Sequence, residues 1–292
     1  MGVQIESRRH PRDSISTAPQ RRCRPVRAPD ADPAGRAHAD ARMLNSSAMR
    51  MPPADLVYLR DQFRELASQV HEHWESSALA DTSPDSPGML GDAMAQLIDM
   101  LSSLTSGGRD DSTQKGDINT LGAYGLQLLE DLTDIARQLN DAALAAEIER
   151  LSLPLALCIA RHDGEIRNLA PVVNAIAQFA NQTTQPQFMS ELYTYCCELI
   201  EAASPTCEEH YASDGRHPWR LLLLNRAIVA TRSLNPELMT PAFDAIVEQL
   251  PDEAQRFFAE GMEQMTIIDY PDPVREVMQR YFSANSAPRR LH

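Results

Sequence analysis

The segment Trp219–Ser233 has the sequence WRLLLLNRAIVATRS and is the longest nearly all-apolar run in the chain. It is shorter than the roughly 20 residues that a membrane-spanning helix needs. It therefore predicts a helix that is buried on most of its faces. Arg226 lies near the middle of this run. Because an unpaired buried charge is costly, we expect Arg226 to have an internal partner. This is either an ion pair with an acid on the next hairpin, Asp244 being the natural candidate, or hydrogen bonds to helix-end carbonyl groups.

The residues on both sides of this run predict further helices. Apolar residues recur at spacings of three and four, the periodic segments are long, and the alternation typical of strands is missing. Aromatic residues make up only 5% of the chain, which indicates an aliphatic core. We predict an all-α protein, built either as a short α-solenoid of stacked helical hairpins or as an irregular multi-helix bundle.

Changes in composition divide the chain into five segments. Residues 1–50 are rich in Arg and Pro and nearly free of large apolar residues, which predicts a disordered N-terminal tail. We expect an N-terminal helical hairpin over residues 51–104 and a flexible linker over residues 105–117. An all-helical, repeat-like domain should follow over residues 118–284, and residues 285–292 should fray.

Prolines, glycines and capping residues mark the predicted helix ends. Asn140 or Asp141 can cap a helix that Pro154 must kink or restart, and Asn235 before a proline is a strong start signal. The predicted helices span about 53–79, 89–104, 118–139, 141–160, 166–180, 186–203, 219–232, 236–249, 251–267 and 272–282.

One of these helices carries a motif of a known family. Leu121-Gly122 followed by Tyr124 resembles the first helix of a tetratricopeptide repeat. The family's Trp position is Ile118 here, its Tyr position is Gly125, and no second copy of the motif follows. The resemblance covers one repeat and implies an α-solenoid, but it assigns no binding residues.

The net charge of −14 is unevenly distributed. Residues 1–50 hold ten Arg and five acidic residues, whereas the remaining 242 residues hold 17 basic and 36 acidic residues, a balance of −19. Such an acidic body repels nucleic acid and anionic lipid. For the basic tail three interpretations stay open: a segment that binds an acidic partner, a transit peptide, or an over-extended start before Met51.

The five cysteines are odd in number and follow no disulfide framework, which favours a reducing, cytoplasmic location. Four residues nevertheless have the chemistry of zinc ligands, Cys196, Cys207, His210 and His217. Their spacing departs from that of paired metal-binding knuckles, so we prefer buried apolar cysteines and a solvated loop histidine. We predict no metal and no cofactor.

The apolar run itself offers the only candidate binding residues. Arg220, Arg226 and Arg232 are six residues apart, about 240° around a helix, so they share no face. Arg226 together with Trp219 or Arg220 could still line a groove for an acidic ligand or partner. We consider an internal ion pair of Arg226 the better interpretation.

No nucleotide-binding, hydrolase or metalloprotease motif occurs, and no catalytic residue is nominated. The first hypothesis for function is a non-catalytic, intracellular protein-interaction or adaptor module with an unidentified protein partner and no membrane segment. The alternative is a small-ligand or metal-binding enzyme with its site near residues 196–226.

Overall fold

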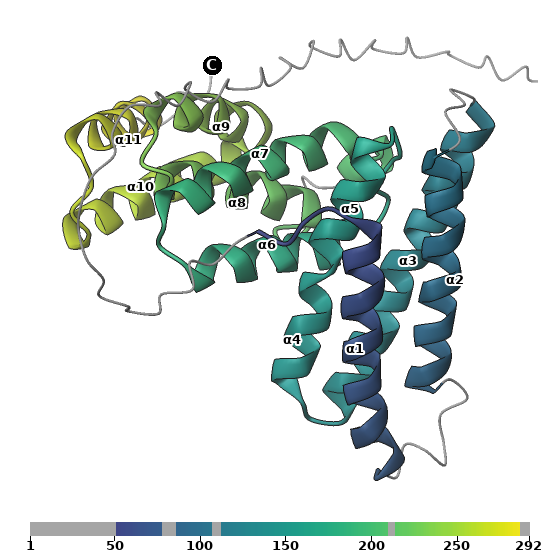
Figure 1. Cartoon of the computed structure of the whole chain (residues 1–292). Coiled ribbons are helices and arrows are strands. Elements are labelled where there is room, and N and C mark those ends of the chain that lie inside the picture. Colours follow the sequence, from purple (N-terminus) through teal and green to yellow (C-terminus); the bar gives the residue numbers. More distant parts are fainter. Residues whose placement is uncertain (1–50, 78–85, 107–111, 210–213, 287–292) are drawn as a thin grey trace, which may run out of the picture. The chain divides into compact units, whose positions relative to one another are not determined.

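The computed structural model describes residues 51–77, 86–106, 112–209 and 214–286. Within these ranges the chain is helical, which confirms the all-α prediction (Figure 1). Across the same residues, no helix combines the length and apolar character needed to cross a membrane. The helices are α1 (Leu56–Glu75), α2 (Pro87–Ser106), α3 (Ser112–Gln138), α4 (Ala142–Arg150), α5 (Ser152–Arg161), α6 (Ala170–Gln182), α7 (Pro186–Ala202), the 3-10 helix η2 (Pro205–Glu208), α8 (Pro218–Arg232), α9 (Pro236–Gln249), α10 (Pro251–Ile267) and α11 (Asp272–Asn285).

The helices from α3 to α8 pack as stacked hairpins. Consecutive helices pair as α3 with α4, α5 with α6 and α7 with α8. Alternate helices also touch: α3 contacts α5 and α5 contacts α7, whereas α4 contacts α6 and α6 contacts α8. This is the contact pattern of an α-solenoid. After α8 the pattern changes, because α9 packs on α8 while α10 and α11 pair with each other and both contact α9.

Hydrogen bonds between polar side chains of neighbouring helices reinforce the stack. Glu149 on α4 accepts hydrogen bonds from Arg137 on α3 (3.1 Å) and from Asn174 (2.9 Å) and Gln178 (2.6 Å) on α6. Its side chain is only 13% exposed. Since hydrogen bonds to a charged group are stronger than neutral ones, this carboxylate links three helices through one acceptor.

The helix-end signals act as predicted. Asp141 accepts a hydrogen bond from the Leu144 amide at the start of α4, and Asn235 accepts one from the Glu237 amide at the start of α9. Pro154 does not kink a long helix: the helix ends at Arg150 and restarts as α5, which places the proline in a first turn where its missing N–H costs nothing.

The expected linker 105–117 is shorter in the structure. Helix α2 continues to Ser106 and α3 already begins at Ser112. Gln114 in the first turns of α3 donates to the Leu104 carbonyl at the end of α2 (2.6 Å), which joins the two helix ends. The helices α1 and α2 then share one hydrophobic core with α3. The predicted tail over residues 1–50 and residues 287–292 of the frayed C-terminus lie outside the described residues.

The connection between α5 and α6 is partly buried: His162, Asp163 and Arg167 are exposed, whereas Gly164 and Ile166 are buried. Ile166, only 1% exposed, pairs with the segment after α7: its amide donates to the Ala202 carbonyl (2.8 Å) and its carbonyl accepts from the Ser204 amide (2.9 Å). Gly164 precedes it in tight packing, because a Cβ atom there would lie 2.6 Å from Ile159 Cγ2 and 3.0 Å from the Ile159 carbonyl oxygen.

Two glycine substitutions should therefore have opposite effects on stability. Gly164→Ala should lower the free energy of unfolding by about 2 kcal/mol because the added methyl group overpacks a rigid turn. Gly116→Ala is the matched control, since its Cβ atom would meet no atom within 4 Å inside α3. It should raise the free energy of unfolding by about 0.8 kcal/mol through helix propensity. Urea unfolding followed by circular dichroism measures both, and an equal effect of the two substitutions would contradict the packing at Gly164.

Candidate binding groove

The apolar run folds into α8 and lies in the core, as its composition predicts. Trp219 is fully buried, and its indole Nε1 donates to Gln249 Oε1 at the end of α9 (3.3 Å). The His217 side chain accepts from the Trp219 amide and so caps the helix. Trp219 therefore holds α8 against α9 and lines no open groove.

Arg220 is the paired arginine of α8. Its side chain is 2% exposed, and Nη2 lies 2.7 Å from Asp252 Oδ2 and 2.9 Å from Glu253 Oε1. Both acids belong to the first turn of α10, where negative charge also suits the helix dipole. Hydrogen bonding to the Arg220 guanidinium holds the pKa of Asp252 below its usual range. Arg220 thus has internal partners and is not available to a ligand.

The ion pair predicted between Arg226 and Asp244 is wrong. Asp244 accepts a hydrogen bond from the Tyr281 hydroxyl (2.5 Å) instead. Arg226 is 6% exposed, its Nε atom lacks a hydrogen-bond partner, and no carboxylate pairs with it in the part of the chain that the structure describes. Sequence reasoning identified a buried, paired arginine in α8 but assigned the pairing to the wrong residue.

The four residues with zinc-ligand chemistry do not converge. Cys196 is fully buried in α7, the Cys207 thiol donates to the Ile166 carbonyl (3.3 Å), and His217 caps α8. His210 lies outside the described residues. Among the described residues, no group of His, Cys, Asp and Glu is arranged to hold a metal ion.

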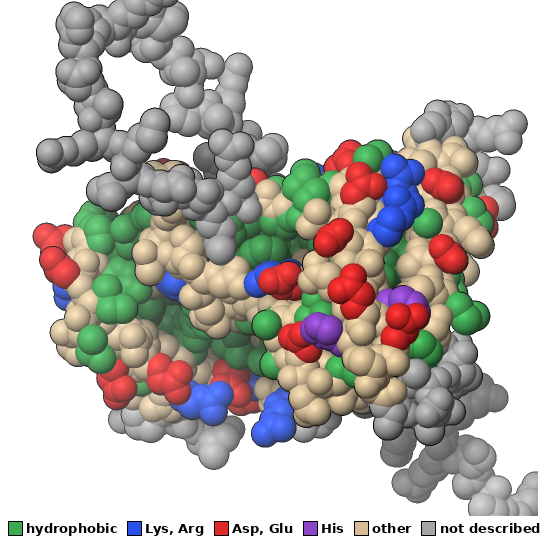
Figure 2. Space-filling view, turned by 60° about the horizontal axis from the view of Figure 1, so that its bottom comes forward, with side chains coloured by type: hydrophobic (Ala, Val, Ile, Leu, Met, Phe, Trp, Pro, Cys, Tyr) green, Lys and Arg blue, Asp and Glu red, His purple; other side chains and the backbone are tan. Residues whose placement is uncertain are grey.

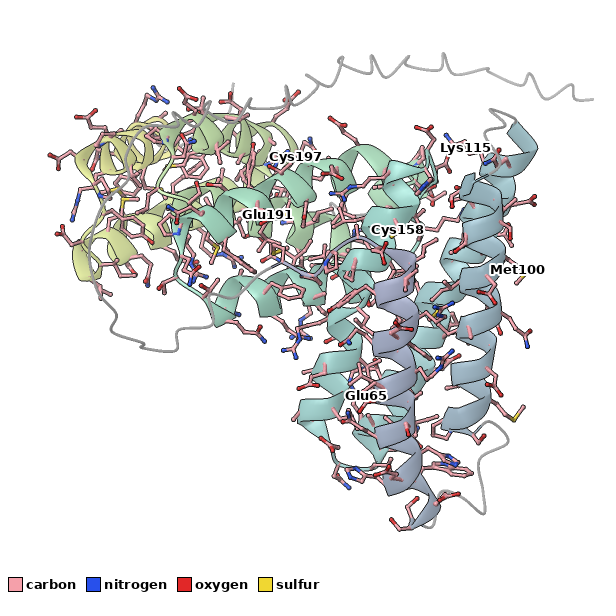
Figure 3. All side chains as sticks on the ribbon, in the orientation of Figure 1. Glu65, Met100, Lys115, Cys158, Glu191 and Cys197 are labelled. Carbon is pink, nitrogen blue, oxygen red and sulfur yellow. The ribbon has the colours of Figure 1, made fainter. Side chains whose placement is uncertain are left out.

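The buried thiols are poor nucleophiles. Burial raises the pKa of Cys158 to about 11 and that of Cys196 to about 12, in the second case against the opposing charge of Arg226. Since the thiolate is the reactive form, these groups remain protonated at neutral pH. Cys158 and Cys197 come from neighbouring helices of the stack, α5 and α7 (Figure 3), and both are buried.

A groove of about 570 Å³ lies beside the C-terminal part of α8. Its walls come from α8, α10 and α11 and from the connections that precede α7, α9 and α11. Its volume lies within the range of about 300–1,000 Å³ that is usual for binding sites. Hydrophobic side chains gather on the half of the molecule that holds these C-terminal helices (Figure 2). The apolar lining includes Ile228, Leu234, Phe257, Met265, Ile268 and Met278.

Polar side chains occupy defined places in this groove. Arg232, in the last turn of α8, donates from Nη2 to the Thr183 carbonyl (2.6 Å). Burial raises the pKa of Tyr270, and the neighbouring charge of Arg232 opposes this rise. Glu260 and Asp269 also line the groove. The arrangement is an apolar surface with a few charged groups, as a recognition site requires.

Leu234 at the edge of the groove has a costly backbone conformation. Its φ angle is 58°, in the left-handed region, directly after the end of α8. Glycine or asparagine is usual at such a position, and the other two described non-glycine residues with positive φ are Asn140 and Asp163. This left-handed backbone conformation costs a leucine about 1–2 kcal/mol of stability. Leu234 is also 37% exposed.

Comparisons with protein-family models, with curated proteins and with solved structures give no match. The groove is therefore interpreted from its own geometry.

Sequence reasoning missed this groove because its lining comes from the ends of helices that are far apart in the chain. Two local signals point to it. Ile267 and Ile268 are adjacent isoleucines at a predicted helix end, 75% and 48% exposed in the structure, and Leu234 follows a helix where glycine is expected. At each of these places, an apolar side chain lies at a helix end where the apolar spacing of the helix does not call for one.

Substitution of the two buried arginines of α8 should separate their roles. Arg220→Met leaves the acidic pair in the first turn of α10 without its cation, so we expect the free energy of unfolding to fall by about 3 kcal/mol. Arg226→Met has a similar shape and removes a buried charge that lacks an acidic partner, so we expect no loss and a gain of about 1 kcal/mol. Urea unfolding of both variants tests this. Equal losses would show that Arg226 is paired as well.

Acid should weaken the contact between Arg220 and Asp252. Because the folded-state pKa of Asp252 is lowered, its contribution to stability is complete above its unfolded-state pKa of about 3.9 and is lost as the pH falls through the folded-state value. The difference in unfolding free energy between wild type and Asp252→Asn should therefore stay constant above about pH 5 and shrink as the pH falls from about 5 to about 2. Thermal unfolding of both proteins across this range measures the difference. A difference in unfolding free energy that stays constant across this range would mean that the charge of Asp252 does not contribute to stability.

Proposed function

We propose that this protein is a non-catalytic protein-interaction module that holds a segment of a partner protein in the groove beside α8, α10 and α11. The observation that carries this proposal is the gathering of exposed apolar side chains at the groove. Ile228, Leu234 and Ile268 line it from three separate segments and are 41%, 37% and 48% exposed. A contiguous apolar surface of this kind is typical of an interaction site.

The remaining exposed hydrophobic residues do not form such a group. Within the described residues, Ile267 adjoins Ile268 but does not line the groove, and Val57, Met89, Met100 and Tyr124 lie on α1, α2 and α3. Met100, for example, stands on the outer side of α2 (Figure 3). Scattered apolar residues are normal on a protein surface and need no explanation. The contrast supports the groove as a surface that a partner covers.

The conformation of Leu234 supports the same function. Strained residues that persist in a fold are often found at functional sites. An asparagine or glycine at this position would relieve the left-handed backbone but would remove the apolar side chain from the groove edge. The cost in stability is understandable if the leucine contacts a partner.

The stacked hairpins from α3 to α8 fit this function, since helical-repeat proteins present extended surfaces to their partners. The resemblance of Leu121, Gly122 and Tyr124 to a tetratricopeptide repeat agrees with this class of protein. We further propose that the protein works in the cytoplasm. The five cysteines are odd in number and follow no disulfide framework, which is typical of proteins in a reducing compartment.

Site-specific photo-crosslinking in native cells tests the groove. A photo-reactive phenylalanine analogue at the exposed groove position Gln264 should form a discrete adduct with a partner protein, because the partner segment lies against this wall. The same analogue at Met100 on α2 is the control and should give no such adduct. Ile228→Asp should abolish the adduct formed from position 264, since a charge in an apolar interface is costly.

Ile228 is 41% exposed, so the substitution should change the free energy of unfolding by less than about 1 kcal/mol. Met100→Asp, at a similar exposure of 48%, should leave the adduct from position 264 intact. The same adducts from both probe positions, or an adduct that persists in Ile228→Asp, would contradict binding in the groove.

A further inference from the structure

Two carboxylates, of Glu260 and Asp269, and one guanidinium, of Arg232, line the groove. Asp269 is paired with Arg275 (2.9 Å), and Glu260 lies 3.8 Å from Arg256. Arg232, by contrast, has no acidic partner in the described ranges of the chain, and its guanidinium donates only to the Thr183 carbonyl. The groove therefore holds one positive charge that no carboxylate neutralises.

This charge is held in place without being neutralised. The Thr183 carbonyl and the C-terminal end of α8 are dipoles, which favour a cation there but carry no net charge. A guanidinium has further N–H groups in a planar fork that matches the two oxygens of a carboxylate. The apolar side chains around it exclude water on binding, and an ion pair is stronger in such surroundings than in bulk water.

The exposure of the apolar residues indicates the size of the occupant. A small molecule within a cavity of about 570 Å³ would leave the outward parts of Ile228, Leu234 and Ile268 in water. A peptide segment that lies across the groove covers them together. The ligand therefore needs several apolar groups and one carboxylate on the same side.

We propose that the groove binds a peptide segment in which an acidic residue is flanked by large apolar residues, with the carboxylate paired to Arg232 and the apolar side chains on Ile228, Leu234 and Ile268. This rests on the proposed function and specifies its partner. The strongly acidic chain repels acidic partners in general. The single unmatched cation thus selects segments that place their carboxylate at one position.

The test uses the full chain and a display library of short random peptides. We expect the enriched peptides to share an acidic residue next to leucine, isoleucine or phenylalanine. For one such peptide, replacing the acid by its amide should weaken binding to the wild type roughly tenfold. Arg232→Met should weaken binding of the acidic peptide by the same factor and leave binding of the amide peptide unchanged, because both changes remove one ion pair.

Two variants keep the test independent of folding defects. Arg232→Lys preserves the charge and should retain part of the affinity for the acidic peptide. Arg232→Glu should bind poorly to the acidic peptide but regain affinity for a peptide with lysine in its place. Arg64→Met is the control: Arg64 is exposed on α1, away from the groove residues, so the dissociation constant should stay at the wild-type value.

The outcomes separate this inference from the function on which it rests. Enriched peptides that require Ile228 but carry no acid, and that bind Arg232→Met as tightly as wild type, would overturn the acidic segment and support the interaction module. Absence of enriched peptides together with absence of an adduct from position 264 would overturn both. Binding of dodecanoate that depends on Arg232, without any peptide binding, would assign the groove to a small amphiphile and also overturn the inference.

Discussion

The ion pair of Arg220 with Asp252 and Glu253 fixes the geometry of the C-terminal half of the molecule. It joins the first turn of α8 to the first turn of α10, although these helices are linked mainly through α9, which contacts both. Burying a guanidinium is favourable only when its hydrogen-bonding groups find anionic partners. The two adjacent carboxylates meet this requirement and tie α10 to α8 at one end.

The groove depends on this constraint. Its lining residues on α8 and α10, such as Ile228 and Gly261, lie farther along both helices than the ion pair. At Gly261 a Cβ atom would lie 2.7 Å from Met278 Sδ, so α11 approaches α10 closely there. One wall of the groove is therefore set by an electrostatic contact between helix starts, and another by close helix packing. The apolar side chains of Ile228 and Ile268 between them are partly exposed.

The sequence predicted the parts of this fold that depend on neighbouring residues. The cap by Asn235 was predicted, and the cap by Asp141 and the helix restart near Pro154 were each one of two predicted alternatives. All three involve contacts within a few residues. The pairing of the α8 arginines depends on which helix face meets α10, some thirty residues later. Periodicity gives the faces of one helix but not the rotation of one helix against another. The sequence therefore predicted a buried, ion-paired arginine in α8 but placed it at Arg226 rather than Arg220. It did not predict the groove.

Arg220 and Arg232 show how one helix can use the same residue type for opposite purposes. Arg220 is buried at the start of α8, where the positive end of the helix dipole disfavours a cation, so it requires two carboxylates. Arg232 lies in the last turn, where the dipole favours a cation, and a backbone carbonyl is enough to position it. Its side chain is thus ordered before a ligand arrives, and its charge is still available. Binding of a carboxylate there therefore costs little side-chain entropy, because the long side chain of Arg232 is already fixed. Arg232 is thus suited to recognition, whereas Arg220 stabilises the fold.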